Sequence, residues 1–152
     1  MKAISLTIIT VVAALSLVGL GSALASGHSA SGAKVSTGRT GLGRIIVDAR
    51  GHTLYLFEPD RRGHSACSAT CAVYWPPLLT HGKPMAGGGA KQSLLGTIRR
   101  SNGARQVTYA GHPVYRYIGD AKRGQTKGQG LQEFGGGWDA LTPAGKKIER
   151  GR

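Results

Sequence analysis

Short apolar runs separated by glycine-bearing turns dominate the chain from residue 44 onward. Ile and Val run through 44–48, residues 49–51 break the run, and β-branched and aromatic residues resume over 53–57. The same pattern recurs at 105–109 and 113–117, with one residue fewer in the turn. Two short apolar runs around a glycine turn are typical of a β-hairpin, so the pattern predicts two hairpins.

Three further segments are predicted to be strands. Residues 94–99 predict an extra strand joined to the second hairpin through Asn102-Gly103, because Asn-Gly is a strong hairpin turn signal. A last short strand is expected at 146–148. The Trp-Pro-Pro-Leu segment at 75–78 predicts an edge strand, since proline cannot donate a ladder hydrogen bond. No apolar period of helical length occurs, and with 25 Gly the chain predicts an all-β, antiparallel fold.

The chain also repeats itself. Residues 51–60 recur sixty positions later at 111–120, with the same Gly-His, the same Tyr-x-aromatic and the same Asp, and a Trp follows each polar loop beyond. Such self-similarity predicts two copies of one unit, 44–79 and 94–148. About 110 folded residues support one core but not two, so we expect two tandem pseudo-repeats sharing one sandwich- or barrel-like core.

The N-terminus is typical of an exported protein. A positive start, an uncharged apolar stretch over 3–21 and an Ala-x-Ala ending at residue 25 predict a signal peptide, 1–25. The alternative is an uncleaved membrane anchor, and membrane association is expected only in that case. Residues 26–43 predict a flexible leader and 44–152 the β domain. No Cys lies near residue 26, so no lipid anchor is expected.

The charge is strongly basic. The chain has 20 Lys and Arg against 7 Asp and Glu, a formal net charge of +13. Such a charge concerns solubility and anionic partners rather than fold. We expect an anionic cell-envelope component or an acidic protein as partner, the alternative being a solvated basic surface. Nucleic acid is not expected, because the chain is exported and its basic residues form no long run.

The repeated motif supplies the candidate binding residues, which are Tyr55, Phe57, Asp60, Tyr115, Tyr117, Asp120, His52 and His112. Strand alternation places the Tyr and the following aromatic on one face, with the Asp just past the strand. In one interpretation the aromatics fill the core and the Asp ties down a loop. In the other they line a shared cleft where paired carboxylates act as acid and base or bind a cation. The matched His residues would suit a metal or haem site there.

One cysteine pair, Cys67 and Cys71, lies in the loop of the first copy. In an exported chain this pair predicts a disulfide that shapes the loop locally. A redox-active dithiol or a metal site with His64 and His81 are the alternatives. The C-x3-C spacing fits neither the C-x-x-C redox motif nor a zinc knuckle.

Together these motifs resemble a bacterial family, the secreted repeat of unknown function, which comprises predicted lipoproteins with a Y-x-[FWY]-x-x-D motif. That motif falls on Tyr55, Phe57 and Asp60, and on Tyr115, Tyr117 and Asp120. The family's C-x3-C before W-P-P-L resembles 67–78, and its V-T-Y-x-G-x-P-x-Y with G-D and G-Q-G resembles 107–130. The resemblance covers about residues 44–145. It implies a repeat fold and an extracytoplasmic location, while the missing lipobox Cys departs from the family pattern.

Two functional hypotheses follow. No nucleophile elbow, phosphate loop or Rossmann fingerprint is present, which favours an exported, non-enzymatic binding protein of the cell envelope without a cofactor. The alternative is an extracytoplasmic accessory to redox or electron-transfer chemistry that holds haem or a metal through the Tyr/His/Asp motif, or docks on an electron-transfer protein. A hydrolase using Asp60 with Asp120 is a third interpretation.

Overall fold

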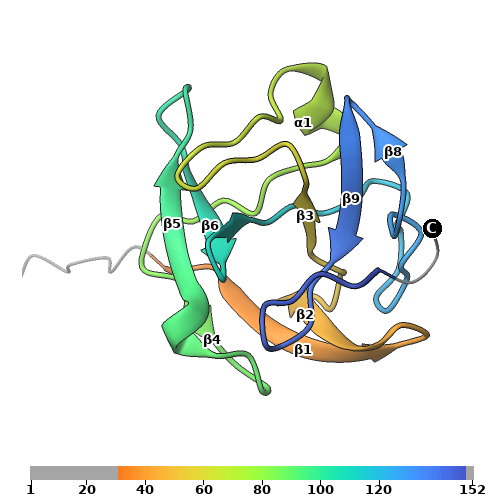
Figure 1. The fold of residues 1–152 in the computed structure, drawn as a ribbon. Helices are drawn as coiled ribbons and strands as arrows, with labels where there is room; N and C mark the ends of the chain where they lie inside the picture. The colour runs from red at the N-terminus through yellow and green to blue at the C-terminus, as the bar shows by residue number, and fades with distance from the viewer. Residues whose placement is uncertain (1–30, 150–152) are drawn as a thin grey trace, which may run out of the picture.

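The computed structural model describes residues 31–149 (Figure 1). The predicted signal peptide, 1–25, lies outside that range, as do the first residues of the predicted leader. Within the range, no helix has the length and apolar character needed to cross a membrane. The elements in chain order are β1 (Lys34–Thr40), β2 (Gly43–Asp48), β3 (Tyr55–Phe57), α1 (Thr70–Tyr74), β4 (Met85–Ala86), the 3-10 helix η1 (Gln92–Leu94), β5 (Leu95–Arg99), β6 (Arg105–Tyr109), β7 (His112–Pro113), β8 (Gln132–Glu133) and β9 (Gly136–Ala140).

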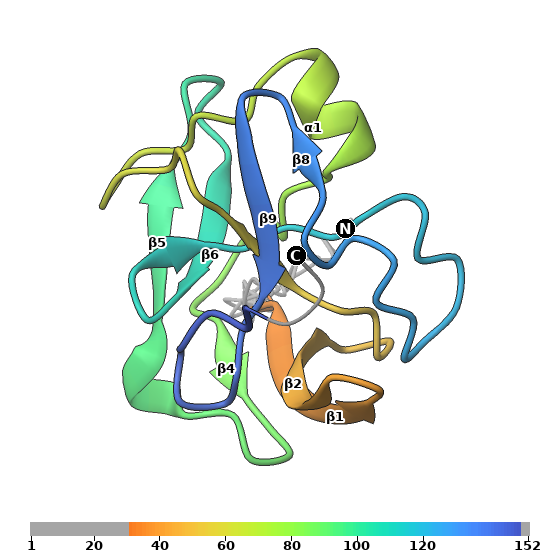
Figure 2. The ribbon, with the colours of Figure 1, turned by 45° about the vertical axis from the view of Figure 1, so that its right-hand side comes forward.

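The strands form three small sheets with the orders β2-β1-β4, β3-β9-β8 and β5-β6-β7. Their ladders are antiparallel except for the two-residue pair of β1 with β4, which is parallel. Figures 1 and 2 show the sheets wrapped around a common interior, with α1 and β8 at one end and β1 with β2 at the other. The predicted all-β fold with one shared core is confirmed.

The predicted flexible leader is wrong from residue 34 onward. β1 pairs with β2 from Val35 opposite Asp48 to Thr40 opposite Gly43. Val35 is fully buried, and the lack of a side chain at Gly38 allows close packing against Val47. Small and polar residues thus form a strand here because a neighbouring strand and the core accept them, which overrides their local preference.

The second hairpin is confirmed, because β6 pairs with β5 through the Asn-Gly turn and with β7 on its other side. The first hairpin is only partly correct. β2 and the segment before β3 meet at a single bridge, Val47 opposite Thr53, and by the bond from Leu54 N to Ile46 O. The principal partner of β3 is β9, with Phe57 opposite Trp138.

Each Trp-bearing segment pairs with the motif strand of the other repeat. β9 of the second repeat lies against β3 of the first, and residues 76–78 of the first repeat lie against 114–116 of the second. Pro77 bridges Tyr115, just as Ala140 lies opposite Tyr55. The two repeats therefore exchange their Trp segments, and neither completes its own sheet.

The exchange corrects two of the predicted strands. The segment at 75–78 is not an edge, because Leu78 donates to Val114 O and accepts from Val107 N. The last predicted strand, 146–148, is reduced to one bridge between Leu141 and Lys147. The loop of the first repeat contains the five-residue helix α1, which is too short to leave an apolar period in the sequence.

Alternation along β3 divides the interior in two. Tyr55 and Phe57 enter a cluster that holds both Trp side chains, whereas Leu54 and Leu56 enter a second cluster of aliphatic residues with Tyr109. The prediction that the aromatic and the Leu side chains point to opposite faces of the strand is confirmed, and both faces are buried. β3 thus contacts the core on both of its faces.

A substitution at Gly128 tests how closely the aromatic cluster is packed. A Cβ at this position would lie 2.8 Å from Trp75 Cη2 and 2.9 Å from Tyr55 Cζ. We expect Gly128→Ala to lower the free energy of unfolding by about 1–3 kcal/mol, as overpacked cores do. Urea denaturation followed by Trp fluorescence measures this change. Gly41→Ala is the matched control, because no atom lies within 4 Å of its Cβ, and a loss as large there would contradict the packing argument.

Candidate functional site

The two copies of the repeated motif are joined by reciprocal hydrogen bonds. Tyr55 donates its hydroxyl to Asp120 Oδ2 at 2.6 Å, and Tyr115 donates its hydroxyl to Asp60 Oδ2 at 2.8 Å. The backbones of the same two tyrosines also exchange N–H···O bonds of 2.9 Å in both directions. Each Tyr thus binds the Asp of the other repeat, and the arrangement is a pseudo-twofold pair.

The second oxygen of each carboxylate holds a loop. Asp60 Oδ1 accepts from the Ala66 N–H at 2.7 Å, and Asp120 Oδ1 accepts from the Lys127 N–H at 2.8 Å. Each Asp lies three residues after the second aromatic of its motif, so one carboxylate connects the loop of its own repeat to the Tyr of the other. The geometry matches the first interpretation of the motif, in which the Asp ties down the loop.

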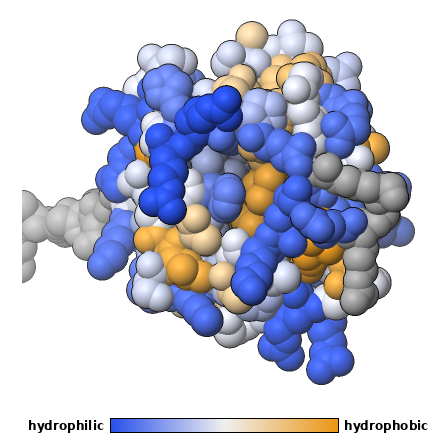
Figure 3. Space-filling view, viewed as in Figure 1, coloured by the Kyte–Doolittle hydropathy of each residue, from blue (hydrophilic) through white to orange (hydrophobic). Residues whose placement is uncertain are grey.

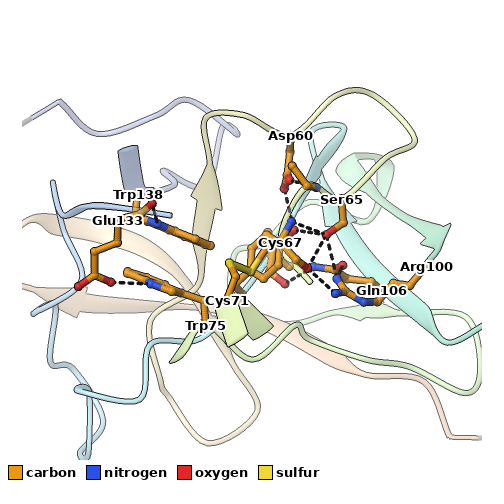
Figure 4. The surroundings of a disulfide bond; sticks show 12 residues. Asp60, Ser65, Cys67, Cys71, Trp75, Arg100, Gln106, Glu133 and Trp138 are labelled. Atoms are coloured by element: carbon orange, nitrogen blue, oxygen red, sulfur yellow. Dashed lines mark hydrogen bonds between the residues drawn. A yellow bond between two sulfur atoms is a disulfide. The ribbon is translucent and has the colours of Figure 1, made fainter. Parts of the chain in front are cut away.

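The motif aromatics form a stack across the centre of the molecule. Its ring order is Phe57, Trp138, Trp75 and Tyr117, with centroid separations of 4.1, 3.9 and 4.4 Å. Tyr55 and Tyr115 meet the two Trp rings edge-on. Trp75 also donates its indole N–H to Glu133 at 2.9 Å (Figure 4). Such stacked and T-shaped contacts add stability beyond area burial, so this cluster is the packing centre of the shared core.

Burial and the carboxylate partners determine the protonation of the two tyrosines. Burial raises the pKa of both hydroxyls, and the hydrogen bond to Asp120 and the charge of Asp60 raise the pKa of Tyr55 and Tyr115 further. Burial likewise raises the pKa of Asp60, although the Ala66 N–H and the Tyr115 hydroxyl oppose that rise. Both tyrosines are therefore neutral donors at physiological pH, suited to holding a carboxylate rather than to removing a proton.

The motif histidines have different surroundings. His52 Nδ1 lies 3.5 Å from Asp48 Oδ2, an oxygen that also accepts from Arg116 Nε at 2.6 Å. His112 lines a shallow hollow with Asp60 and Arg62, and burial followed by the Arg62 charge lowers the pKa of His112. In residues 31–149, no three or more His, Cys, Asp and Glu side chains are grouped so that they could hold a metal ion. The binding role of the eight motif residues stays a prediction.

The disulfide between Cys67 and Cys71 is present, as predicted, and both cysteines are buried. Beside it lies a group of residues that the motif does not contain (Figure 4). Arg100 donates to Ser65 Oγ at 2.9 Å, to Gln106 Oε1 and to Cys67 O. Ser65 Oγ also lies 2.7 Å from the Tyr115 hydroxyl, so this group is directly connected to the motif. The adjacent Arg99-Arg100 before the Asn-Gly turn was its only signal in the sequence.

These observations define a class of protein, a two-repeat β domain whose copies exchange segments around one aromatic core. A family model described as a secreted repeat of unknown function matches residues 36–79 and 96–142, more than half of the chain. The chain belongs to this family, and the resemblance drawn from the repeated motif is confirmed. Comparison with curated proteins finds no match, and neither does comparison with solved structures. The family description supports an exported location, whereas the lack of a lipid anchor stays a prediction.

A substitution at Tyr55 tests the contribution of the reciprocal Tyr–Asp hydrogen bonds to stability. Tyr55→Phe keeps the ring but leaves the Asp120 carboxylate, which is 5% exposed, without its side-chain donor. We expect a loss of about 1.5–3 kcal/mol in the free energy of unfolding, typical of hydrogen bonds to charged groups. Chemical denaturation measures it. Tyr74→Phe is the matched control, because Tyr74 is 45% exposed, and equal effects of the two variants would refute the role of the pair.

The pKa values of Asp48 and Asp60 are shifted in opposite directions, so we expect the two carboxyl groups to change the unfolding free energy at acid pH in opposite directions. Burial alone would raise the pKa of Asp48, but the His52 N–H, Arg116 and the Arg50 N–H lower it below the ordinary 3.8. Its contribution is present above pH 3.8 and is lost as pH falls through the depressed value, so Asp48→Asn should flatten the acid decline in unfolding free energy. The pKa of Asp60 is raised. Asp60→Asn should therefore steepen the decline.

Urea unfolding between pH 3 and pH 7 distinguishes these signs. The comparison of the two Asn variants controls for the loss of one carboxylate. Profiles that change in the same direction for both variants would show that the two carboxylates do not differ in the way their surroundings indicate.

Proposed function

We propose that this secreted repeat is a non-enzymatic binding protein for an anionic component of the cell envelope. The observation that carries the proposal is the placement of the acidic residues. All seven carboxylates of the chain have partners within the fold, which leaves the basic side chains to dominate the exterior. A surface of this kind attracts anions over distances set by ionic strength.

Most of the carboxylates bond to uncharged donors. Asp60 and Asp120 accept from tyrosines, Glu133 accepts from Trp75, and Asp139 accepts from the Gln129 amide. None of these four hydrogen bonds uses a Lys or Arg side chain, so they occupy no basic side chain.

Two cationic side chains account for the Lys and Arg ion pairs among residues 31–149. Arg116 pairs with Asp48, and Lys147 pairs with Glu58 and Glu149. Figure 3 shows hydrophilic side chains spread over much of the face that carries β5 and β6. The hydrophilic exterior is broad, and the formal charge of +13 makes the chain basic overall, which favours a polyanion over an acidic side chain on a small interface.

The redox alternative has less support. A haem or metal held through the motif would need the Tyr55 and Tyr115 hydroxyls or the carboxylates they bind. Both tyrosines and Asp120 are buried, Asp60 is half-buried, and each Tyr is already bonded to the Asp of the other repeat. Withdrawing them would leave buried polar groups unpaired, at a cost of about 1–3 kcal/mol each. A surface role requires no such change.

Retention on anionic vesicles tests the proposed function. Vesicles with anionic lipid should retain the mature chain at low ionic strength, because a basic residue near such a surface contributes about 1 kcal/mol. Retention should fall as salt shortens the Debye length from about 10 Å to about 3 Å, and neutral vesicles should retain none. Sedimentation of the vesicles measures the bound fraction, with isolated cell wall as a second matrix. Absence of retention on both matrices, or retention that ignores salt, would contradict the proposal.

A further inference from the structure

A cleft of about 220 Å³ lies between the disulfide loop of the first repeat and the turn that joins β5 to β6. Its lining residues are His64, Ser65, Ser68, Arg99, Arg100 and Ser101. Two guanidinium groups, an imidazole and three hydroxyls thus surround one space, and no carboxylate belongs to the lining. We refer to this space as the arginine cleft.

Hydrogen bonds hold Arg100, one of the lining residues of the arginine cleft, in place (Figure 4). Its guanidinium donates to Ser65 Oγ at 2.9 Å, to Gln106 Oε1 at 2.5 Å and to Cys67 O at 2.5 Å. All three acceptors are uncharged, so these bonds orient the group. The Arg100 charge also acts on the Asp60 carboxylate, whose pKa it lowers. Because the side chain is partly buried, solvent screens this charge less than it screens a charge on the open surface.

The wall formed by the disulfide loop is also fixed. Arg61 and His64 exchange backbone hydrogen bonds of 3.1 and 2.9 Å. The Cys67–Cys71 disulfide closes the short loop that contains Ser68. Ser65 Oγ contacts the Tyr115 hydroxyl at 2.7 Å. The donors are thus positioned before any ligand arrives, which reduces the entropy lost on binding.

The equivalent place in the second repeat lacks these features. There Asp120 accepts from the Lys127 N–H, next to Gly128, and the loop has no cysteines. In the first repeat the offset of sixty residues places Arg39 at the position of Arg99. Arg39 lines a separate cleft with Thr40, Gly43 and Arg44, which contains no Ser or His. The donor set, which both repeats supply, therefore forms at only one of the two equivalent places.

We propose that the arginine cleft binds the phosphate group of an anionic envelope component, a deepening that rests on the proposed function. A carboxylate offers two acceptor oxygens, whereas a phosphate group offers more and is matched by the planar fork of arginine. The Arg99 guanidinium, the two Arg100 N–H groups that its bonds within the fold leave over and the hydroxyls of Ser68 and Ser101 supply more donors than a carboxylate can use. Phosphodiesters of a wall polymer and phosphates of lipid headgroups share this chemistry.

A substitution at Arg99 tests the cleft, because its side chain is exposed and makes no hydrogen bond or ion pair within residues 31–149. The mature full-length chain is titrated at constant ionic strength with inorganic phosphate and with a soluble phosphodiester polymer, by calorimetry or by NMR shifts. We expect Arg99→Gln to weaken both affinities about tenfold, the effect of one lost charge-assisted hydrogen bond. Arg39→Gln is the matched control. Arg39 is exposed like Arg99, occupies the equivalent position in the strand of the first repeat and, like Arg99, lies opposite another arginine in the ladder. This control variant should change affinity less than twofold.

The outcomes separate the two proposals. Equal weakening by Arg99→Gln and Arg39→Gln would overturn the arginine cleft in favour of a diffuse charge effect, and so would wild-type protein that ignores phosphate yet is retained on anionic vesicles. In both results the proposed function survives. Failure of phosphate, polymer and vesicles together would remove both proposals.

The source of the phosphate follows from the same variants. Selective loss of vesicle retention in Arg99→Gln supports the arginine cleft with a lipid headgroup as ligand. Selective loss of polymer binding supports it with a wall phosphodiester. Ser101→Ala provides a second variant in the turn that follows Arg99, and an effect on phosphate affinity no larger than that of Arg39→Gln, in both Ser101→Ala and Arg99→Gln, would overturn the site.

Discussion

The hydroxyls of Tyr55 and Tyr115 each reach a carboxylate in the other repeat, and most of the architecture follows from that reciprocity. The same carboxylates hold the loops through Ala66 and Lys127. Strand β3 can then pair with β9 while its counterpart in the second repeat pairs with the Trp-Pro-Pro-Leu segment of the first. Because the copies exchange segments, the stability of each depends on the other, and a chain of this size obtains one core rather than two inadequate ones.

The pseudo-symmetry of the core contrasts with the difference between its loops. Both loops begin at a motif Asp and end at a Trp of the central stack, so the core fixes their ends. Between those ends the first loop has a disulfide and the short helix α1, whereas the second has a glycine-rich turn. A rigid scaffold that fixes loop ends permits the loops to diverge and to carry function. The arginine cleft lies beside the first loop only, and it contacts the core through Ser65 and Tyr115.

Local patterns predicted what depends on near neighbours. Alternation assigned Tyr55 and Phe57 to one face and Leu54 and Leu56 to the other, and the Cys spacing indicated the disulfide. The leader was misjudged because Gly, Ser and Thr over 34–40 lack a strand signal of their own. The internal repeat contained the missing signal, since an offset of sixty places the predicted strand 94–99 on that segment. The lining of the arginine cleft had no such signal, because it joins residues that lie more than thirty positions apart.

The sequence by itself determined the family, the all-β class, the two repeats and the central place of the motif, because a period of two and an internal repeat are properties of the chain. The tertiary structure decided which strands are partners. Pairing β3 with β9 rather than with β2 depends on long-range contacts that repay the entropy of closing a loop of about eighty residues. It also decided that the motif Asp and Tyr bind each other across repeats, since buried polar groups require partners and the fold placed these within reach.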